Sequence, residues 1–457
     1  MSLRLTLDYA RQLLQQASKA APSGTALELT VEETNSELTR FANNAIHQNV
    51  ADAALTLSLR AQIDDRTARA TTHRHDEPGL TELVARTLAL TGSQARDADL
   101  LPMALPAPIE PVNRWDENTA AITPAQRADA VAAMVEIAKS EALTAAGICA
   151  TQHGAAAIVN TNGVEAFYRS TGAEFSVTML HEMASGWAKG GSVRWSDLDP
   201  AAGARIAAAK AGAAAQPKEL APGRYTVILE PAAVLDLLGF VMWDFGARQI
   251  LEQSSFLSGG RLGSKLFGDN VAITDDCYHP LQSGAPFDGE GVPRQRVDLV
   301  EDGWARRVVY ARQSAAEWKR VHADQPEPAP TGHGLPLPNP YGEFPLNVVF
   351  RGGDVPVERM IAETERGILI TRLWYIREVD PYQKILTGMT RDGTFLIEQG
   401  KLAHGVRNFR FNQSMVELLN QIEAMSPEVR ASGEESFDMV VPALKVRGFN
   451  FTETTKF

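Results

Sequence analysis

Apolar and polar residues alternate along the first part of the chain in a pattern that predicts one helix followed by several strands. Apolar side chains recur at helical spacing over residues 5–20. Strict alternation then predicts strands over residues 27–31, 38–41 and 54–59. The Asn43–Asn44 pair lies between the last two of these strands and is typical of a turn. This part of the chain therefore predicts a helix and an antiparallel sheet.

Two further helices are expected over residues 80–91 and 124–143, separated by a proline-rich crossing loop. Thr123 favours the start of the second helix, because its side chain can cap the first turn and the proline that follows fits that turn. Strands resume afterwards, and residues 161–163, Thr-Asn-Gly, predict a hairpin turn between them. The expected strands span residues 147–153, 155–160, 164–170 and 173–180.

An alanine-rich helix over residues 200–215 is followed by proline and glycine, and we place a domain boundary there. The second domain opens with a buried-type strand over residues 225–229 and a helix over residues 232–253. Short alternating runs follow at residues 367–374, 394–398, 405–411 and 440–451. The pattern predicts an α+β fold with an N-terminal domain, residues 1–218, that has an antiparallel sheet with helices. The larger C-terminal domain, residues 219–457, is expected to be mostly antiparallel β.

The chain carries more acidic than basic residues, which makes some classes of binding partner less favourable. The 457 residues carry a formal net charge of −12, which disfavours general binding to nucleic acid or to an anionic membrane. The chain has no run of about 18 uncharged apolar residues, so we expect no membrane span. The two cysteines, Cys149 and Cys277, are far apart and sit beside no catalytic base, which fits a reducing cytoplasm and argues against a disulfide framework.

Several blocks in the same order along the chain resemble the TldD/PmbA family. Each block alone is a weak signal, because glycine and asparagine runs serve any tight turn. Their shared order across nearly the whole chain is much more specific. The matching blocks are Arg40–Gln48 (RFANNAIHQ), Pro222–Leu229 (PGRYTVIL), Ser255–Gly263, Ile273–Asp276, Arg377–Val379, Gly393–Lys401 and Val406–Asn412.

In that family, zinc-bearing TldD members carry a His-Glu-x-x-x-His helix after the strand matched by residues 222–229, and a cysteine ligand near the C-terminus. Imidazoles and a thiolate hold the zinc, and the glutamate takes a proton from the metal-bound water. Here residues 234–246 contain neither histidine nor glutamate, and residues 425–457 contain no cysteine. The resemblance therefore implies a PmbA-like (TldE-like) chain with no catalytic residue, metal ligand or cofactor of its own. Zinc is expected in the partner subunit.

The helix expected over residues 232–253 is the main candidate for a surface that faces substrate or partner. Large apolar side chains cover more of its circumference than a core-facing stripe requires: Phe240, Met242, Trp243 and Phe245. Asp236 and Asp244 are expected to be solvated at the helix surface or paired locally, since two carboxylates without imidazole do not make a zinc site. The candidate cavity residues are Asp236, Phe240, Trp243 and Asp244.

Other histidine and glycine patterns are weak candidates for chemistry. His181-Glu182 begins like a zincin motif, but Ser185 and Gly186 stand where a second ligand would be, so a strand end or partner-facing loop is expected. The glycine run at residues 258–264 lacks the Lys-Ser/Thr ending of a phosphate loop. The remaining histidines that could bind metal only incidentally or through the fold are His73, His75, His279, His333 and His404.

Three functions stay open at this point. By resemblance, the chain is a non-catalytic subunit of a cytoplasmic zinc peptidase complex that trims or degrades unfolded peptides, with a TldD-like subunit as partner. A homodimer in the absence of that subunit is also open. The second hypothesis is an independent hydrolase whose site is assembled from distant segments. The third is a non-enzymatic regulator that binds a protein partner.

Overall fold

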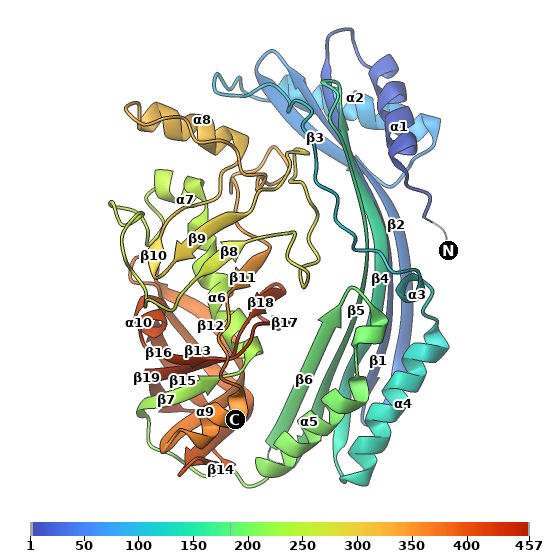
Figure 1. The fold of residues 1–457 in the computed structure, drawn as a ribbon. Coiled ribbons are helices and arrows are strands. Elements are labelled where there is room, and N and C mark those ends of the chain that lie inside the picture. The colour runs from blue at the N-terminus through green and yellow to red at the C-terminus, as the bar shows by residue number, and fades with distance from the viewer. Residues whose placement is uncertain (1–2, 183, 456–457) are drawn as a thin grey trace.

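The computed structural model describes residues 3–182 and 184–455, and it places a long curved sheet beside a β-rich C-terminal half (Figure 1). The long sheet has the order β3-β2-β1-β4-β5-β6 and is antiparallel throughout. Its strands are β1 Ala26–Ala42, β2 Ala45–Ile63, β3 Arg66–Thr72, β4 Thr144–Asn160, β5 Glu165–His181 and β6 Ala184–Ser192. The α+β class expected from the sequence is confirmed.

Four of these strands are much longer than the alternating runs that predicted them. Residues 27–31 and 38–41 belong to one strand, β1, and residues 147–153 and 155–160 belong to β4. The prediction of separate strands was wrong because residues 32–38 of β1 are only partly covered, so the apolar pattern fades while pairing continues. The Asn43–Asn44 turn is confirmed, and both residues have positive φ.

Helices cover one face of the long sheet and create two separate cores. Odd-numbered β1 residues such as Leu29 and Val31 pack under α1 and α2, while Phe41 packs with α4 and α5. The even-numbered residues, such as Glu28, face the C-terminal half. The helices are α1 Leu7–Ala20, α2 Glu77–Ser93, α4 Pro124–Ser140 and α5 Pro200–Ala213, with the short α3 Glu117–Ala120 and η1 Trp195–Asp197. Thr123 caps α4 in a capping box, as expected.

The C-terminal half contains two sheets around one large core. The first has the order β10-β9-β8-β11-β18-β17, and the second has the order β12-β7-β19-β15-β13-β14, with β16 paired to β19. Most pairs are antiparallel, but β11–β18 and β12–β7 are parallel. The strands are β7 Gly223–Leu229, β8 Ile273–Asp275, β9 Val297–Glu301, β10 Trp304–Ala305, β11 Val348–Phe350, β12 Arg366–Asp380, β13 Ile385–Glu398, β14 Lys401–Gly405, β15 Phe409–Ser414, β16 Ile422–Met425, β17 Val429–Ala431, β18 Met439–Val441 and β19 Leu444–Thr454.

The helix expected over residues 232–253 is broken into three pieces. The structure has α6 Pro231–Met242, the 3-10 turn η2 Trp243–Phe245 and α7 Ala247–Leu251. Gly246 is extended between them, and the backbone of Val309 bonds to Phe245 and Ala247 on either side of it. These bonds take backbone groups that a continuous helix would use, so the prediction of one helix was wrong. The other helices of this half are α8 Arg312–Val321, α9 Val357–Ala362 and α10 Met415–Asn420.

The long sheet contacts the C-terminal half in an upper and a lower region, and between them Tyr168 Oη donates to Ser283 O. In the upper one, buried Glu28 pairs with Arg60 at 3.0 Å and with Arg69 at 2.7 Å, and Glu290 from the other half pairs with Arg312 at 2.9 Å and Arg60 at 3.7 Å. In the lower one, side chains of β6 bond to β13 and to residues near 433. Open space between these regions forms the cavities described below.

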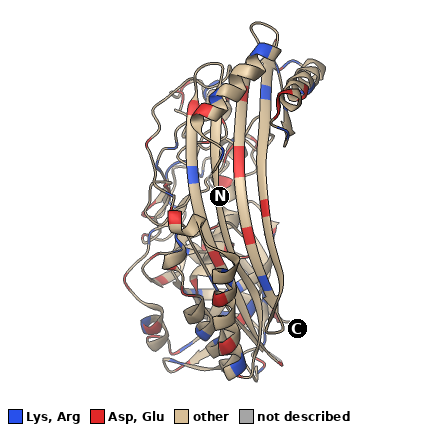
Figure 2. Cartoon of the chain, turned by 90° about the vertical axis from the view of Figure 1, so that its right-hand side faces the viewer, with Lys and Arg blue, Asp and Glu red and all other residues tan. Residues whose placement is uncertain are grey.

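Acidic and basic residues alternate along the long strands and helices on the side of the molecule shown in Figure 2. Within residues 3–182 and 184–455, none of the helices is both long and apolar enough to cross a membrane. The domain boundary after residue 218 stays a prediction.

Candidate functional site

Helix α6 follows directly from β7 and is buried on almost every side. Pro231 stands in its first turn, where a missing N–H costs nothing, and the apolar residues after it pack against β12. Asp236 is fully buried in this helix, whereas Phe240 is half-buried. A carboxylate inside an apolar helix is costly to desolvate, so its surroundings define the candidate site.

The Asp236 carboxyl group has only part of its hydrogen-bonding capacity filled. Its Oδ1 accepts the backbone N–H of Glu435 at 3.1 Å, whereas its Oδ2 has no partner among the residues that the structure describes. Burial raises the pKa of Asp236 to about 7, with the nearby Glu435 charge adding to the effect and Arg372 opposing it. Asp236 is therefore an acid whose protonation changes near neutral pH.

The segment of residues 433–436 lies directly over this face of α6. A Cβ on Gly433 would come within 2.3 Å of Asp236 Oδ1, and a Cβ on Gly239 would come within 1.9 Å of Ser436 Oγ. Both positions therefore require glycine for close approach. The chain's own C-terminal region thus covers the side of α6 that carries Asp236.

Hydrogen bonds from two other elements hold this covering segment in place. The Glu435 carboxylate accepts the backbone N–H groups of Tyr375 and Ile376, at 2.9 and 3.2 Å, where β12 changes register and Tyr375 has positive φ. From β6, Lys189 Nζ donates to Gly433 O at 2.9 Å. The segment is therefore fastened to both halves of the molecule.

A buried ion pair lies between β12, β13 and β6. Arg372 Nε donates to Asp392 Oδ2 at 2.7 Å, and Ser185 Oγ donates to Asp392 Oδ1 at 2.5 Å. The guanidinium also lies 5.0 Å from the ring centre of Trp187. Because Arg372 favours the charged form of Asp236, this pair connects the lower contact region to α6 electrostatically.

Asp244 has a different environment from Asp236. It is buried in η2 and forms an ion pair with Lys384 Nζ, which also pairs with Glu378 at 2.5 Å. Burial raises the pKa of Asp244 to about 6 although Lys384 opposes the shift. The expectation of surface solvation was therefore wrong for both aspartates, while the alternative of local pairing is confirmed for Asp244.

Trp243 is the exposed member of the aromatic group. Its side chain is 46% exposed and stacks on Phe344 with ring centres 4.4 Å apart. Met242 and Phe245 are fully buried in the core. The break after Met242 explains this division, because η2 turns Trp243 outward while its neighbours stay inside.

The donor atoms present do not fit a zinc ion. In the described part of the chain, no three His, Cys, Asp or Glu side chains lie close enough to share a metal. His181 ends β5 as an exposed residue, as expected for a strand end, and Met183 of the same segment lies outside the described residues. His333 instead pairs with buried Asp275 at 2.9 Å.

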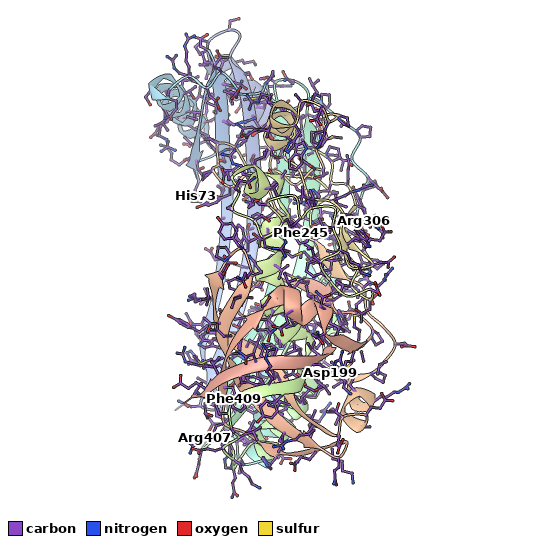
Figure 3. The ribbon with its side chains drawn as sticks, turned by 90° about the vertical axis from the view of Figure 1, so that its left-hand side faces the viewer. His73, Asp199, Phe245, Arg306, Arg407 and Phe409 are labelled. Atoms are coloured by element: carbon purple, nitrogen blue, oxygen red, sulfur yellow. The ribbon has the colours of Figure 1, made fainter. Side chains whose placement is uncertain are left out.

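The remaining candidate histidines and cysteines do not join the site. His73 lies beside the upper part of the long strands, far from the C-terminal sheet that carries Phe409 (Figure 3). His404 bonds to Gly405 O. Cys149 and Cys277 are buried, and burial raises their thiol pKa values to about 12 and about 11. Neither thiol is therefore an activated nucleophile.

Comparison with known proteins identifies the family. Residues 222–453 match the C-terminal domain of PmbA/TldA metallopeptidases, and residues 117–215 match their central domain. This chain belongs to the PmbA/TldD metallopeptidase family. The match covers the long strands β4 and β5 and the whole region that contains α6 and its covering segment.

Two curated metalloproteases and two solved structures of other proteins are similar to this PmbA/TldD chain. Metalloproteases of Methanothermobacter thermautotrophicus and Synechocystis sp. are 20% identical over 217 residues and 26% identical over 219 residues, 46% and 45% of this chain. The matched regions span less than half the length of these relatives, 44% and 42%. TldE from Thermococcus kodakarensis has the same fold, with a TM-score of 0.85 at 18% identity, covering 97% of this chain and 100% of that one. A proposed modulator of a DNA gyrase from Thermotoga maritima has a TM-score of 0.83 at 20% identity, covering 97% and 99%.

The family fold separates the four candidate cavity residues rather than gathering them. Asp236 faces residues 433–435, Asp244 faces Lys384, Phe240 packs partly against the core and Trp243 faces outward. Sequence reasoning missed Glu435 and Arg372, which act on Asp236, and Lys189 and Asp392, which hold the covering segment and Arg372, because all four come from distant segments. The Gly-Glu-Glu-Ser run at residues 433–436 was the one local signal, since two acids beside a glycine interrupt an otherwise alternating region.

We expect Asp236→Asn to stabilise this PmbA/TldD chain increasingly as pH rises. The unfolded chain releases the Asp236 proton near pH 4, whereas the folded chain keeps it until about pH 7, so the parent loses stability across that window. Asparagine keeps an acceptor for Glu435 N–H and does not titrate. Between pH 4 and pH 8 the free energy of unfolding should shift in favour of the variant by about 2–4 kcal/mol. Urea unfolding at both pH values measures it, with the exposed Asp129→Asn as control. A difference that does not change with pH would contradict the assignment.

Proposed function

We propose that this chain is the zinc-free subunit of a cytoplasmic TldD-type metallopeptidase complex that degrades or trims unfolded peptides. Its partner is a TldD-like subunit that carries the zinc. In this arrangement the chain completes a chamber and holds peptide, while the partner performs hydrolysis.

The observation that supports this proposal is that α6 lacks zinc ligands and is covered by another segment of the same chain. Active TldD members are expected to carry their zinc-binding His-Glu-x-x-x-His on the corresponding helix, where this chain has only Asp236 and Asp244. The Asp236 face is further covered by residues 433–436 of the same chain. A helix that lacks ligands and is closed by its own chain supports a structural role for this half of the family fold.

Exposed aromatic side chains near the end of α6 support a docking surface for the partner. Trp243, stacked on Phe344, is the best anchor, because a large amphipathic ring buries much area at little entropic cost. Tyr375 and Tyr382, on β12 and the β12–β13 turn, are also more than half exposed. Aromatic residues are enriched in the cores of protein interfaces, which favours this surface over the acidic remainder of the chain.

Hollow space between the two halves supports a role in holding peptide. One cavity, of about 450 Å³, lies between the inner face of β1, β4 and β5 and residues Arg430 and Asp438. A second, of about 590 Å³, adjoins it along β6. Both have the size of typical ligand sites, and both lie against strands whose backbone suits an extended chain.

The test is reconstitution with a TldD-type subunit. The chain alone should not hydrolyse an unstructured peptide, because its described residues offer neither a zinc site nor an activated nucleophile. A mixture with the partner should form a two-chain complex, measured by light scattering after size exclusion, and should cleave the peptide in a chelator-sensitive way.

Each subunit alone and the partner with an unrelated acidic protein provide the controls. Chelator-resistant cleavage by the chain alone would instead favour an independent hydrolase. Failure to form a complex or to raise the partner's activity would reject the proposed subunit role.

A further inference from the structure

The cavity of about 590 Å³ along β6 has an unusual positive lining. It is bounded by β6, by the start of α5 and by residues 280–282, and Arg114 and Arg430 contribute to its wall. Gly190 and Gly191 of β6 also line it, and their missing side chains leave room for Phe175 and Ser432 on opposite faces of the strand. The cavity therefore lies between β6 and two guanidinium groups.

Arg114 is buried without a carboxylate partner. Its backbone is fixed on β5, since its carbonyl accepts the Thr171 N–H at 2.9 Å, and its side chain is 8% exposed. One terminal nitrogen, Nη2, donates to the carbonyls of Cys277 and His279, both at 3.0 Å. Its Nε has no acceptor, and no ion pair forms to it, anywhere in residues 3–182 and 184–455. A buried guanidinium without a counter-charge is costly to desolvate, and an anion in the adjoining cavity would offset that cost.

Arg430 is a second guanidinium in the same wall. It pairs with Asp438 at 2.7 Å and donates to Ser283 Oγ at 3.0 Å and to Leu281 O at 3.1 Å. Burial lowers the pKa of Arg114, and the charge of Arg430 lowers it further. The two like charges are thus close enough to interact, and an anion in the cavity would offset their repulsion.

The other charged groups of the lining leave this surplus in place. Lys189 Nζ forms ion pairs with Glu174 and Glu434 at 3.7 and 3.5 Å, and these carboxylates offset its positive charge. The two acidic residues of the lining bind groups other than the arginines. Asp197 accepts a hydrogen bond from Ser192 Oγ at 2.7 Å, and Asp199 caps α5. Arg194 adds a further cation for which the described chain provides no ion pair.

We propose that this cavity binds a carboxylate through Arg114 and Arg430, and that the carboxylate is the C-terminus of a short peptide lying along β6. The peptide source rests on the proposed function, whereas the carboxylate chemistry rests on the two arginines. Charge-assisted hydrogen bonds from a guanidinium are stronger to a carboxylate than to a neutral amide, which distinguishes a free C-terminus from an amidated one.

Calorimetric titration of the chain alone with tetra-alanine tests the proposal. The free acid should bind at least about tenfold more tightly than the C-terminal amide, because charge-assisted hydrogen bonds are the stronger class. Arg114→Gln should remove this preference, and Arg114→Lys should restore part of it. Arg306→Gln, at an exposed position near residues 301 and 304, is the matched control and should bind like the parent.

Arg114→Gln could lose binding simply by misfolding, since Arg114 also bonds to the carbonyls of residues 277 and 279. A second variant therefore tests the cavity without changing Arg114. Ala202→Met narrows the cavity from α5 and leaves the arginines unchanged in sequence, so it should weaken binding while the melting temperature stays within a few degrees of the parent. Equal binding of acid and amide, or unaltered binding by both Arg114→Gln and Ala202→Met, would overturn the proposal. Binding of acetate or inorganic phosphate without binding of tetra-alanine would overturn the peptide assignment.

These outcomes are independent of the partner. If the acid is not preferred but the two-chain complex still cleaves peptide, the carboxylate site fails and the proposed function stands. If the free-acid peptide binds more tightly than the amide but no two-chain complex forms, the carboxylate site stands and the proposed function fails.

Discussion

Trp243→Ala is expected to weaken binding of the TldD-type partner by about thirtyfold or more, because a central tryptophan typically contributes about 2 kcal/mol or more to an interface. Trp243 is almost half exposed and packs against the Phe344 ring at an interplanar angle of 32°, so it is pre-organised for burial by a partner. The chain's own melting temperature should change little, since the core side chains beside it, Met242 and Phe245, are untouched. Surface plasmon resonance with the immobilised partner measures the affinity.

The matched control for this substitution is Trp304→Ala. Trp304 is also partly exposed, at 37%, but it lies on β10 and stacks with Arg306 rather than near α6. Its loss should leave partner binding intact. Equal losses of affinity for both variants would point to a general effect on folding, and an unchanged affinity for Trp243→Ala would remove this surface from the interface. Unfolding of Trp243→Ala would mean that the ring belongs to the core.

Arg372→Met is expected to lower the free energy of unfolding by about 2–4 kcal/mol, because it leaves buried Asp392 without its main counter-charge. Ser185 Oγ still donates to that carboxylate, and Arg391 lies 3.6 Å from it, so the loss stays below that of a fully orphaned charge. The guanidinium also packs near the rings of Trp187 and Trp374, and methionine replaces part of that contact. Equilibrium unfolding in urea measures the change.

A double-mutant cycle separates the ion pair from packing. Arg372→Met combined with Asp392→Asn should be less destabilised than the sum of the single variants, since the second change removes the orphaned charge. Arg351→Met breaks an exposed pair with Asp302 at 3.7 Å and should be nearly neutral. Strict additivity of the two buried substitutions would show that Arg372 and Asp392 do not act as a pair.

The sequence predicts local elements of this fold better than their extent. Helix starts that depend on one side chain, such as Thr123, were predicted correctly, because a cap acts within one turn. The length of β1 could not be read from alternation, since its middle faces open space and carries polar residues on both sides. The helix break at Gly246 depends on backbone hydrogen bonds from Val309, more than sixty residues away, so the local sequence does not predict it.

The sequence predicts where the candidate site lies along the chain, but not the burial or the partners of its residues. Residues 232–245 were singled out because they lack the zinc ligands that the family motif requires, and their position after β7 is confirmed. The sequence could not show that Asp236 is fully buried, because its partner Glu435 lies 199 residues further along the chain. Its raised pKa comes from that burial, which only the fold creates.

The length of β1 also determines where this protein can vary in length. Odd residues of β1 build the cores under the helices, while Glu28 on the even face joins the upper contact region. Inserting or deleting a single residue within β1 would exchange the two faces for the remainder of the strand, placing acids in the core and leucines in the inter-half space. Within the long sheet, insertions and deletions are therefore expected in the turns near residues 43, 64 and 162, or at a β-bulge such as the one between Arg40 and Phe41. The paired strands between these turns fix the distance between the upper and lower contact regions.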